Sequence, residues 1–392
     1  MIATRARSLA ILSALAGVAL ALEPGAAKEA AARVDVKRAQ ASVEAFCAPE
    51  LMGRKTGTVG AKKTTALIAR CFEEAGLAKL EGTSSYVVTG EGGDEDVVGR
   101  IPGSDRAAEA IVVSAHWDSL GEDETGKLVP GADENGSGLA ALLETARALA
   151  KAKPRRTLVF ASFGGWWDMN DAKRFRGAKD FLKLKKVQPI FQVDLMMLGV
   201  PLLPSEPERF FALGTESSPA LADVLKQSAA QESELRVARA SADLVEKRGP
   251  RDDYDAFRAA GVPFVFLTSG VSRFYHKVGD VPATVDPKRI AAAARLAIQL
   301  VAHVDALDVA PSFAKETTHD DRADATEVLG LIEAALGDKS GIALEARDRK
   351  ALSFKRDRIK DLLEPTGDLH LEPRDRGILK DSLELLLLAL TK

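Results

Sequence analysis

The chain has 392 residues, 46% of them hydrophobic, which is enough to bury one large core with room for a small appendage. Its 54 basic and 57 acidic residues leave a net charge of −3. This balance excludes the basic excess or stripe of a nucleic-acid-binding protein, and no nucleic-acid partner is expected.

The first residues have the pattern of an export signal. Arg5 and Arg7 precede an apolar run, and Ala19-Leu20-Ala21 has the small-x-small spacing of a cleavage site. We therefore expect residues 1–21 to be a secretory signal peptide and the mature protein to be exported, to the periplasm or the medium. The apolar run is too short for a membrane span, and no later segment reaches that length.

Helical spacing follows over residues 36–50 and 61–75, on either side of a Gly-rich turn. Cys47 and Cys71 fall one in each of these predicted helices. In an oxidising compartment the two thiols could pair, and the alternative is two separate buried thiols. Sequence leaves both open, and the spacing does not indicate a metal site.

Four apolar, β-branched runs predict buried strands, with helical segments between them. Such an alternation favours an α/β domain with a mixed, largely parallel sheet and helices on both faces. Polar residues at the carboxyl ends of these strands are where a site should form. The predicted strands cover residues 110–114, 157–163, 192–198 and 263–268.

A helix over residues 287–306 is expected to close this domain, which spans residues 22–307. The polar segment 308–322 is predicted to be a linker. Residues 323–392 show helical spacing and are interpreted as a C-terminal helical appendage. Its apolar stretch fits packing against the main domain, with a protein partner of these helices as the alternative.

Two of the five histidines lie where metal ligands would. His116 ends a predicted strand, and Asp118 can accept its second ring N–H and fix its tautomer. Asp133 lies in a tight turn before a helix, where a carboxylate can bridge two cations or merely cap the helix. His276 follows the last strand, with a structural histidine as the alternative.

These pieces resemble the secreted di-zinc aminopeptidases of metallopeptidase family twenty-eight, over residues 51 to 307. The resemblance implies a zinc aminopeptidase-like fold. It also implies that His116 holds the first zinc, Asp133 bridges both ions, and His276 holds the second, with Asp118 orienting His116. The matching motifs, in order, are Gly53-Arg54-Lys55-Thr56-Gly57, Ala115-His116-Trp117-Asp118, the turn 130–138, the strand 157–163, Asp252-Asp253-Tyr254 with Ala260-Gly261-Val262-Pro263, and Tyr275-His276.

Three carboxylates of the family pattern are absent. Trp166 stands at the position of the general base and Trp167 at that of a ligand of the second zinc, and an indole neither accepts a proton nor coordinates zinc. Aligned on Gly199, the next strand has Met196 at the position of an aspartate ligand of the first zinc. Each zinc loses one of three protein ligands, so we expect zinc binding to be weak or absent.

The first hypothesis is a catalytically impaired pseudo-peptidase that acts by binding a peptide or another small ligand. Its pocket would be lined by Trp117, Trp166, Trp167 and Tyr275.

The alternative hypothesis is an active zinc-dependent exopeptidase, an aminopeptidase in which Asp168 and Asp194 replace the missing ligands. A third function, glutaminyl cyclisation, is performed by related proteins with one zinc. It is disfavoured because its glutamate ligand falls at Trp167.

Overall fold

The computed structural model describes residues 22, 24–166, 175–245, 252–314 and 319–391. The predicted signal peptide, Trp167 and Asp168 therefore lie outside the described residues. Within the described part, no helix is both long enough and apolar enough to cross a membrane.

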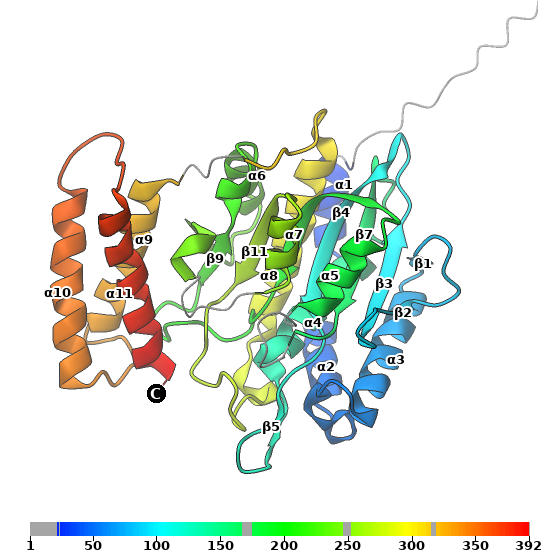
Figure 1. The fold of residues 1–392 in the computed structure, drawn as a ribbon, viewed down its shortest axis with the longest axis horizontal. Coiled ribbons are helices and arrows are strands. Elements are labelled where there is room, and N and C mark those ends of the chain that lie inside the picture. The colour runs from blue at the N-terminus through cyan, green and yellow to red at the C-terminus, as the bar shows by residue number, and fades with distance from the viewer. Residues whose placement is uncertain (1–21, 23, 167–174, 246–251, 315–318, 392) are drawn as a thin grey trace, which may run out of the picture.

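A nine-stranded mixed sheet forms the centre of the fold (Figure 1). Its four central strands, β7, β4, β8 and β11, run parallel to one another, whereas β3 and β9 flank them antiparallel. The predicted α/β class is thus confirmed. In spatial order the strands are β1 (Ala78–Lys79), β3 (Glu95–Ile101), β7 (Arg156–Phe163), β4 (Arg106–His116), β8 (Gln188–Leu195), β11 (Phe264–Thr268), β9 (Arg209–Leu213) and β10 (Arg236–Ala240), with β2 (Val87–Thr89) paired to β3; β5 (Gly121–Glu122) and β6 (Leu128–Val129) form a separate hairpin.

Helices cover both faces of this sheet because the central strands are apolar on both sides. Along β4, Ile111 and Val113 face one helix layer and Val112 faces the other. The first layer contains α1 (Pro24–Ala31), α2 (Val36–Phe46), α4 (Gly138–Leu149), α6 (Leu221–Ala229) and α8 (Pro287–Ala306), and the second contains α5 (Arg176–Lys183) and α7 (Tyr254–Ala259), while α3 (Val59–Glu74) packs on β3.

The long helix α8 is central to the first layer. Asp286 caps its N-terminus by accepting from Lys288 N (2.9 Å), and Pro287 takes the first helical position, where its missing N–H costs nothing. A buried, alanine-rich face then allows α1, α2, α4 and α6 to approach it closely.

The two cysteines are both free and half-buried, which answers the question that the sequence left open. Cys47 caps the C-terminus of α2, and Cys71 lies in α3. Burial raises the pKa of the Cys47 thiol to about 11, so this thiol is not a reactive thiolate at neutral pH.

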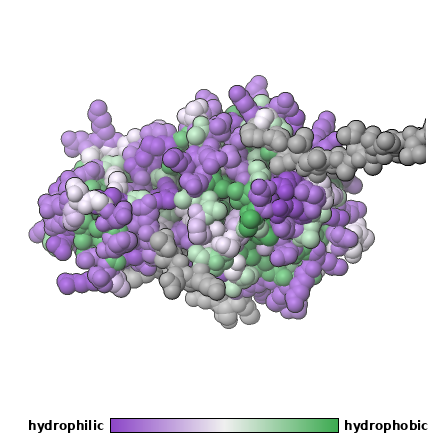
Figure 2. Space-filling view, turned by 90° about the horizontal axis from the view of Figure 1, so that it is seen from above, coloured by the Kyte–Doolittle hydropathy of each residue, from purple (hydrophilic) through white to green (hydrophobic). Residues whose placement is uncertain are grey.

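Three C-terminal helices form the appendage: α9 (Asp321–Leu336), α10 (Ala346–Leu363) and α11 (Pro373–Thr391). Their buried side chains share one apolar cluster with Leu213, Ala240 and Leu244 of the main domain. The helices therefore pack against the domain, next to β10. In Figure 1 they lie at one end of the sheet, beyond β9. The molecular surface seen from above is mostly hydrophilic, and apolar residues gather near the middle of this face (Figure 2).

A buried arginine fastens the appendage to the main domain. Arg376 of α11 donates to Asp243 (2.9 Å), which belongs to the main domain, and to Asp321 (2.5 Å) and Asp324 (2.9 Å) of α9. Although burial opposes it, hydrogen bonds from Arg376 and Lys380 lower the pKa of Asp243 to about 2. The contribution of Asp243 to stability is therefore full above about pH 4 and is lost as the pH falls through about 2.

Replacing this arginine should loosen the appendage. We expect Arg376→Ala to lower the free energy of unfolding by about 3–5 kcal/mol, because it leaves buried carboxylates without their cation. Urea denaturation at pH 7 measures the change. Arg374→Ala, at an exposed position of the same helix, is the matched control and should stay within about 0.5 kcal/mol of the wild type. Equal effects of the two variants would contradict this role for Arg376.

Candidate functional site

The candidate site lies at the carboxyl ends of neighbouring strands. His116 is the last residue of β4, Trp166 follows β7, and Met196 follows β8 directly. His276 belongs to the loop after β11. Because these strands are parallel neighbours, their ends meet at one edge of the sheet, as predicted for an open α/β fold.

One buried arginine holds together the loops around this edge. Arg54 is fully buried, and its guanidinium donates only to backbone oxygens. Gly131 must be a glycine here, because it has φ +67° and an added Cβ would lie 2.8 Å from Arg54 Nη2. The acceptors are Phe46 O (2.9 Å), Trp117 O (2.9 Å), Pro130 O (2.8 Å), Gly131 O (2.8 Å) and Glu134 O (3.2 Å).

The turn that carries Asp133 is fixed from two sides. Asp280 accepts from Asp133 N (2.7 Å) and Glu134 N (3.1 Å). Asp133 Oδ1 accepts from Gly199 N (2.9 Å) and Ser137 Oγ (3.2 Å), which ties the turn to the chain after β8. Asp133 thus does not cap α4, and its Oδ2 accepts no hydrogen bond from the residues that the structure describes. Burial raises the pKa of Asp133 to about 7.

His116 is oriented by Asp118, but not through the carboxylate as predicted. Its Nδ1 lies 2.9 Å from the backbone oxygen of Asp118 and 3.6 Å from Oδ1. The carboxylate instead accepts from Thr56 Oγ1 (3.0 Å) and Trp166 N (3.0 Å), which holds the chain after β7 in place. With Nδ1–H donating to a carbonyl, Nε2 of a neutral His116 is an acceptor.

Trp166 occupies the space between the two histidines. Its ring stacks on the His116 imidazole, with centroids 4.7 Å apart and planes 10° apart. The His276 ring lies roughly perpendicular to the same indole, with centroids 6.3 Å apart and planes 78° apart. The indole is 6% exposed. Burial, and to a lesser degree His116, lower the pKa of His276 to about 4, so this histidine is neutral at pH 7.

The described residues do not bring together a complete ligand set for two zinc ions. In the described part of the chain, His116, Asp133 and His276 do not belong to any group of three ligand atoms within 4.8 Å of one another. The Trp166 indole lies against both imidazoles and cannot serve as a ligand. Met196, at the level of His116 on the adjacent strand, is fully buried.

Asp194 does not replace Met196, contrary to the exopeptidase hypothesis. It pairs in register with Ser114, two residues before His116, and therefore lies deeper in the sheet. Its Oδ1 accepts from Ser114 Oγ (2.7 Å), and its Oδ2 accepts from Tyr254 N (2.9 Å). The other predicted substitute, Asp168, lies outside the described residues.

The predicted tryptophan-lined pocket also needs correction. Trp117 is only 1% exposed, and its Nε1 donates to Glu95 O (2.7 Å). It therefore belongs to the hydrophobic core. Tyr275 is half-buried, and its ring stacks against that of His276, with centroids 3.7 Å apart. Trp167 lies in a part of the chain that is not described.

Sequence reasoning missed Glu134, although the adjacent acidic pair in the turn was a usable signal. Glu134 is 2% exposed, and its Oε1 lies 3.5 Å from His116 Nε2. Neither of its oxygens accepts a hydrogen bond among the described residues. Burial, together with the charges of Asp280 and Asp133, raises its pKa well above the usual range.

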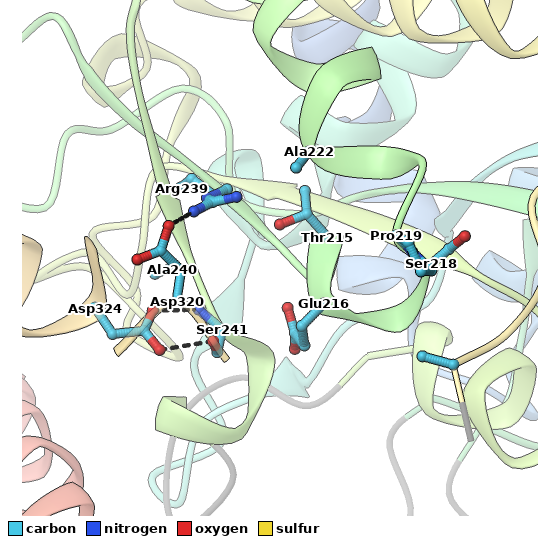
Figure 3. A pocket seen from close by; sticks show the side chains of 11 residues that line it. Thr215, Glu216, Ser218, Pro219, Ala222, Arg239, Ala240, Ser241, Asp320 and Asp324 are labelled. Carbon is cyan, nitrogen blue, oxygen red and sulfur yellow. Dashed lines mark hydrogen bonds and ion pairs between the residues drawn. The ribbon is translucent and has the colours of Figure 1, made fainter. Parts of the chain in front are cut away.

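Several cavities flank the sheet edge and the appendage, among them one beside the His276 loop and one beside β10. One of about 400 Å³ adjoins the His276 loop, with Val200, Arg273, Phe274 and Leu390 among its lining residues. The other, of about 280 Å³, lies beside β10, and its charged groups largely satisfy one another (Figure 3). There Arg239 pairs with Asp320, Ser241 Oγ donates to Asp324 (2.6 Å), and burial raises the pKa of Glu216 to about 7.

Comparison with known sequences points to one family. A model of "Peptidase family M28" matches residues 96–301, which is more than half of the chain. A "Probable leucine aminopeptidase" of Trichophyton verrucosum is 30% identical over 103 residues, or 26% of this chain and 27% of that protein. "Nicalin" of Caenorhabditis elegans is 45% identical over 56 residues, or 14% and 10% of the two chains. These alignments span about a quarter or less of each relative.

Solved structures share the fold at low sequence identity. The LapA aminopeptidase of Legionella pneumophila superposes with a TM-score of 0.60 at 15% identity, covering 78% of this chain and 81% of that one. The glutaminyl cyclase of Porphyromonas gingivalis gives a TM-score of 0.55 at 17% identity, covering 68% and 98%. Such likenesses establish the arrangement of the elements and leave the chemistry to the site itself.

Proposed function

Because the chain belongs to peptidase family M28, we propose that it is an exported pseudo-peptidase, which keeps the family fold and binds peptides without hydrolysing them. The observation that carries this proposal is the position of Trp166, whose indole fills the space between His116 and His276. The general base of the family is missing at the same position, and loss of a general base alone costs about 10²–10⁴ in rate.

The cavity of about 400 Å³ beside the His276 loop supports the binding half of the proposal. Its volume lies in the range of small-ligand sites, and most of its wall is apolar. Arg273 is one of the lining residues and offers a positive charge to the carboxylate of a short peptide.

One observation favours the competing function, an active zinc exopeptidase. The carboxylate of Glu134 lies 3.5 Å from His116 Nε2. It is therefore a further acidic side chain beside this histidine, in addition to those that the family pattern predicts. A glutaminyl cyclase has no comparable support beyond the shared fold. Zinc content and turnover separate the exopeptidase from the pseudo-peptidase.

Export belongs to the same proposal and has support at the start of the described chain. Leu22 is buried, and its N donates to Asp305 Oδ2 (3.0 Å). Asp305 also accepts from Arg155 N (3.0 Å) and Arg156 N (2.8 Å). Cleavage after Ala21 would turn the Leu22 amide into an ammonium group that faces this buried carboxylate.

Intact-mass measurement of the protein recovered from the periplasm or medium should give a chain that begins at Leu22. Replacing both small residues, Ala19→Arg with Ala21→Arg, should block cleavage and leave the precursor, because the peptidase site requires small side chains. Recovery of wild-type protein that keeps residues 1–21 would contradict the export proposal.

Turnover and metal content test the catalytic half. Purified without chelators, the wild type should carry less than one zinc per chain by elemental mass spectrometry. It should release no product from leucyl p-nitroanilide above the level of His116→Ala. Restoring the two glutamates of the family in Trp166→Glu/Trp167→Glu should raise the zinc content. Two zinc ions per wild-type chain, with turnover that His116→Ala abolishes, would establish the exopeptidase instead.

Calorimetric titration with a tripeptide library tests the binding half. We expect Arg273→Ala to weaken binding by about 10–100-fold, because a hydrogen bond to a charged group contributes about 1.5–3 kcal/mol. Val278→Ala, an exposed position of the same loop outside the cavity, is the matched control and should bind like the wild type. Absence of any tripeptide binding by the wild type would remove the proposal.

A further inference from the structure

Three acidic side chains meet beneath the site, on the side of the sheet that α7 covers. Asp194 lies near the end of β8, and Asp252 and Asp253 immediately precede α7. Each carboxylate contributes an oxygen atom, and these atoms all lie within 4.8 Å of one another. All three side chains are fully buried.

This group lacks a compensating charge. Both oxygens of Asp253 and Oδ2 of Asp252 accept no hydrogen bond in the described part of the structure. No arginine or lysine among the described residues pairs with any of the three. Isolated buried carboxylates are strongly unfavourable unless a cation or a proton neutralises them.

A fourth buried carboxylate, from another element, adds to the negative charge near this group. Glu134 comes from the turn before α4, and its two buried oxygens accept no hydrogen bond from described residues. Its charge acts on Asp252. The buried guanidinium of Arg54 acts on Glu134 through its charge, but its hydrogen bonds to oxygen go to five backbone carbonyls and none goes to the three aspartates.

We propose that Asp194, Asp252 and Asp253 bind a hard divalent cation of the calcium and manganese class. A site built from carboxylate oxygens, without imidazole or thiolate, suits these ions better than zinc. The spacing agrees, because Ca²⁺ takes oxygen ligands at about 2.3–2.6 Å and so bridges atoms up to about 5 Å apart. The cation joins the end of β8 to the start of α7, in a structural role separate from His116 and His276.

The hydrogen bonds around Asp194 prepare it for this role. Gln192 Nε2 donates to Ser114 Oγ (2.9 Å), and Ser114 Oγ donates to Asp194 Oδ1 (2.7 Å). Tyr254 N holds the other oxygen. Ligating carboxylates are typically oriented by such outer contacts, which fix the side chain while leaving lone pairs for the ion.

Binding of Mn²⁺ to the full-length mature protein, stripped with EDTA, tests the site by the loss of the free-ion electron paramagnetic resonance signal. We expect one Mn²⁺ per chain, displaced by excess Ca²⁺ and not by equimolar Zn²⁺. Asp253→Asn should weaken Mn²⁺ binding by about tenfold or more. Asp324→Asn is the matched control, since it changes a buried aspartate of the appendage, away from the group and from His116 and His276, and should bind as the wild type does.

A second measurement needs no variant and covers the case in which Asp253→Asn does not fold. Millimolar Ca²⁺ or Mn²⁺ should raise the thermal unfolding midpoint of the stripped wild type, because an ion that binds only the folded state stabilises it. An unchanged midpoint, or equal Mn²⁺ binding by the wild type and Asp253→Asn, would overturn the site and assign protons to these carboxyl groups. Neither readout depends on peptide binding or turnover, so this inference and the proposed function can fail separately.

Discussion

The hydrogen bonds of Arg54 are the constraint on which the edge of the sheet depends. Five backbone oxygens from three separate segments of the chain accept hydrogen bonds from this one guanidinium. A planar, permanently charged donor group can hold them together without needing a carboxylate partner. The turn of Asp133, the exit from β4 and the end of α2 are therefore fixed relative to one another, whatever occupies the space between the histidines.

Within that fixed frame, the position of greatest change is the one that follows β7. An indole there stacks on His116 and contributes apolar burial where the family comparison calls for a carboxylate. The frame itself keeps its polar contacts: Asp118 still anchors Trp166 N, and Asp280 still holds the Asp133 turn. Membership of family M28 therefore does not by itself assign an activity to this chain.

Sequence predicted the central strands because both of their faces are apolar, and it located His116, Asp133 and His276 because motifs follow strand ends. It missed β9 and β10, two five-residue strands at one end of the sheet, of which β10 is the edge strand with a mixed burial pattern. The directions in which side chains point could not be predicted from the sequence either. The burial of Trp117 and the meeting of Asp194 with Asp252 and Asp253 depend on register and on contacts about 60 residues apart, which no local pattern encodes.

The last helix, α11, forms part of a cavity wall in addition to packing within the appendage. Leu390 of α11 lines the cavity beside the His276 loop, and the next residue, Thr391, accepts at its backbone oxygen from Lys277 Nζ (2.9 Å). The C-terminal helices therefore form one wall of that cavity, and the main domain forms the other. Thermodynamic reciprocity then applies: any occupant that touches both walls tightens the docking of α11, and anything that strains α11 weakens the occupant by the same factor. A fusion placed directly after residue 392 would therefore change both the docking of α11 and the affinity of the cavity for its occupant.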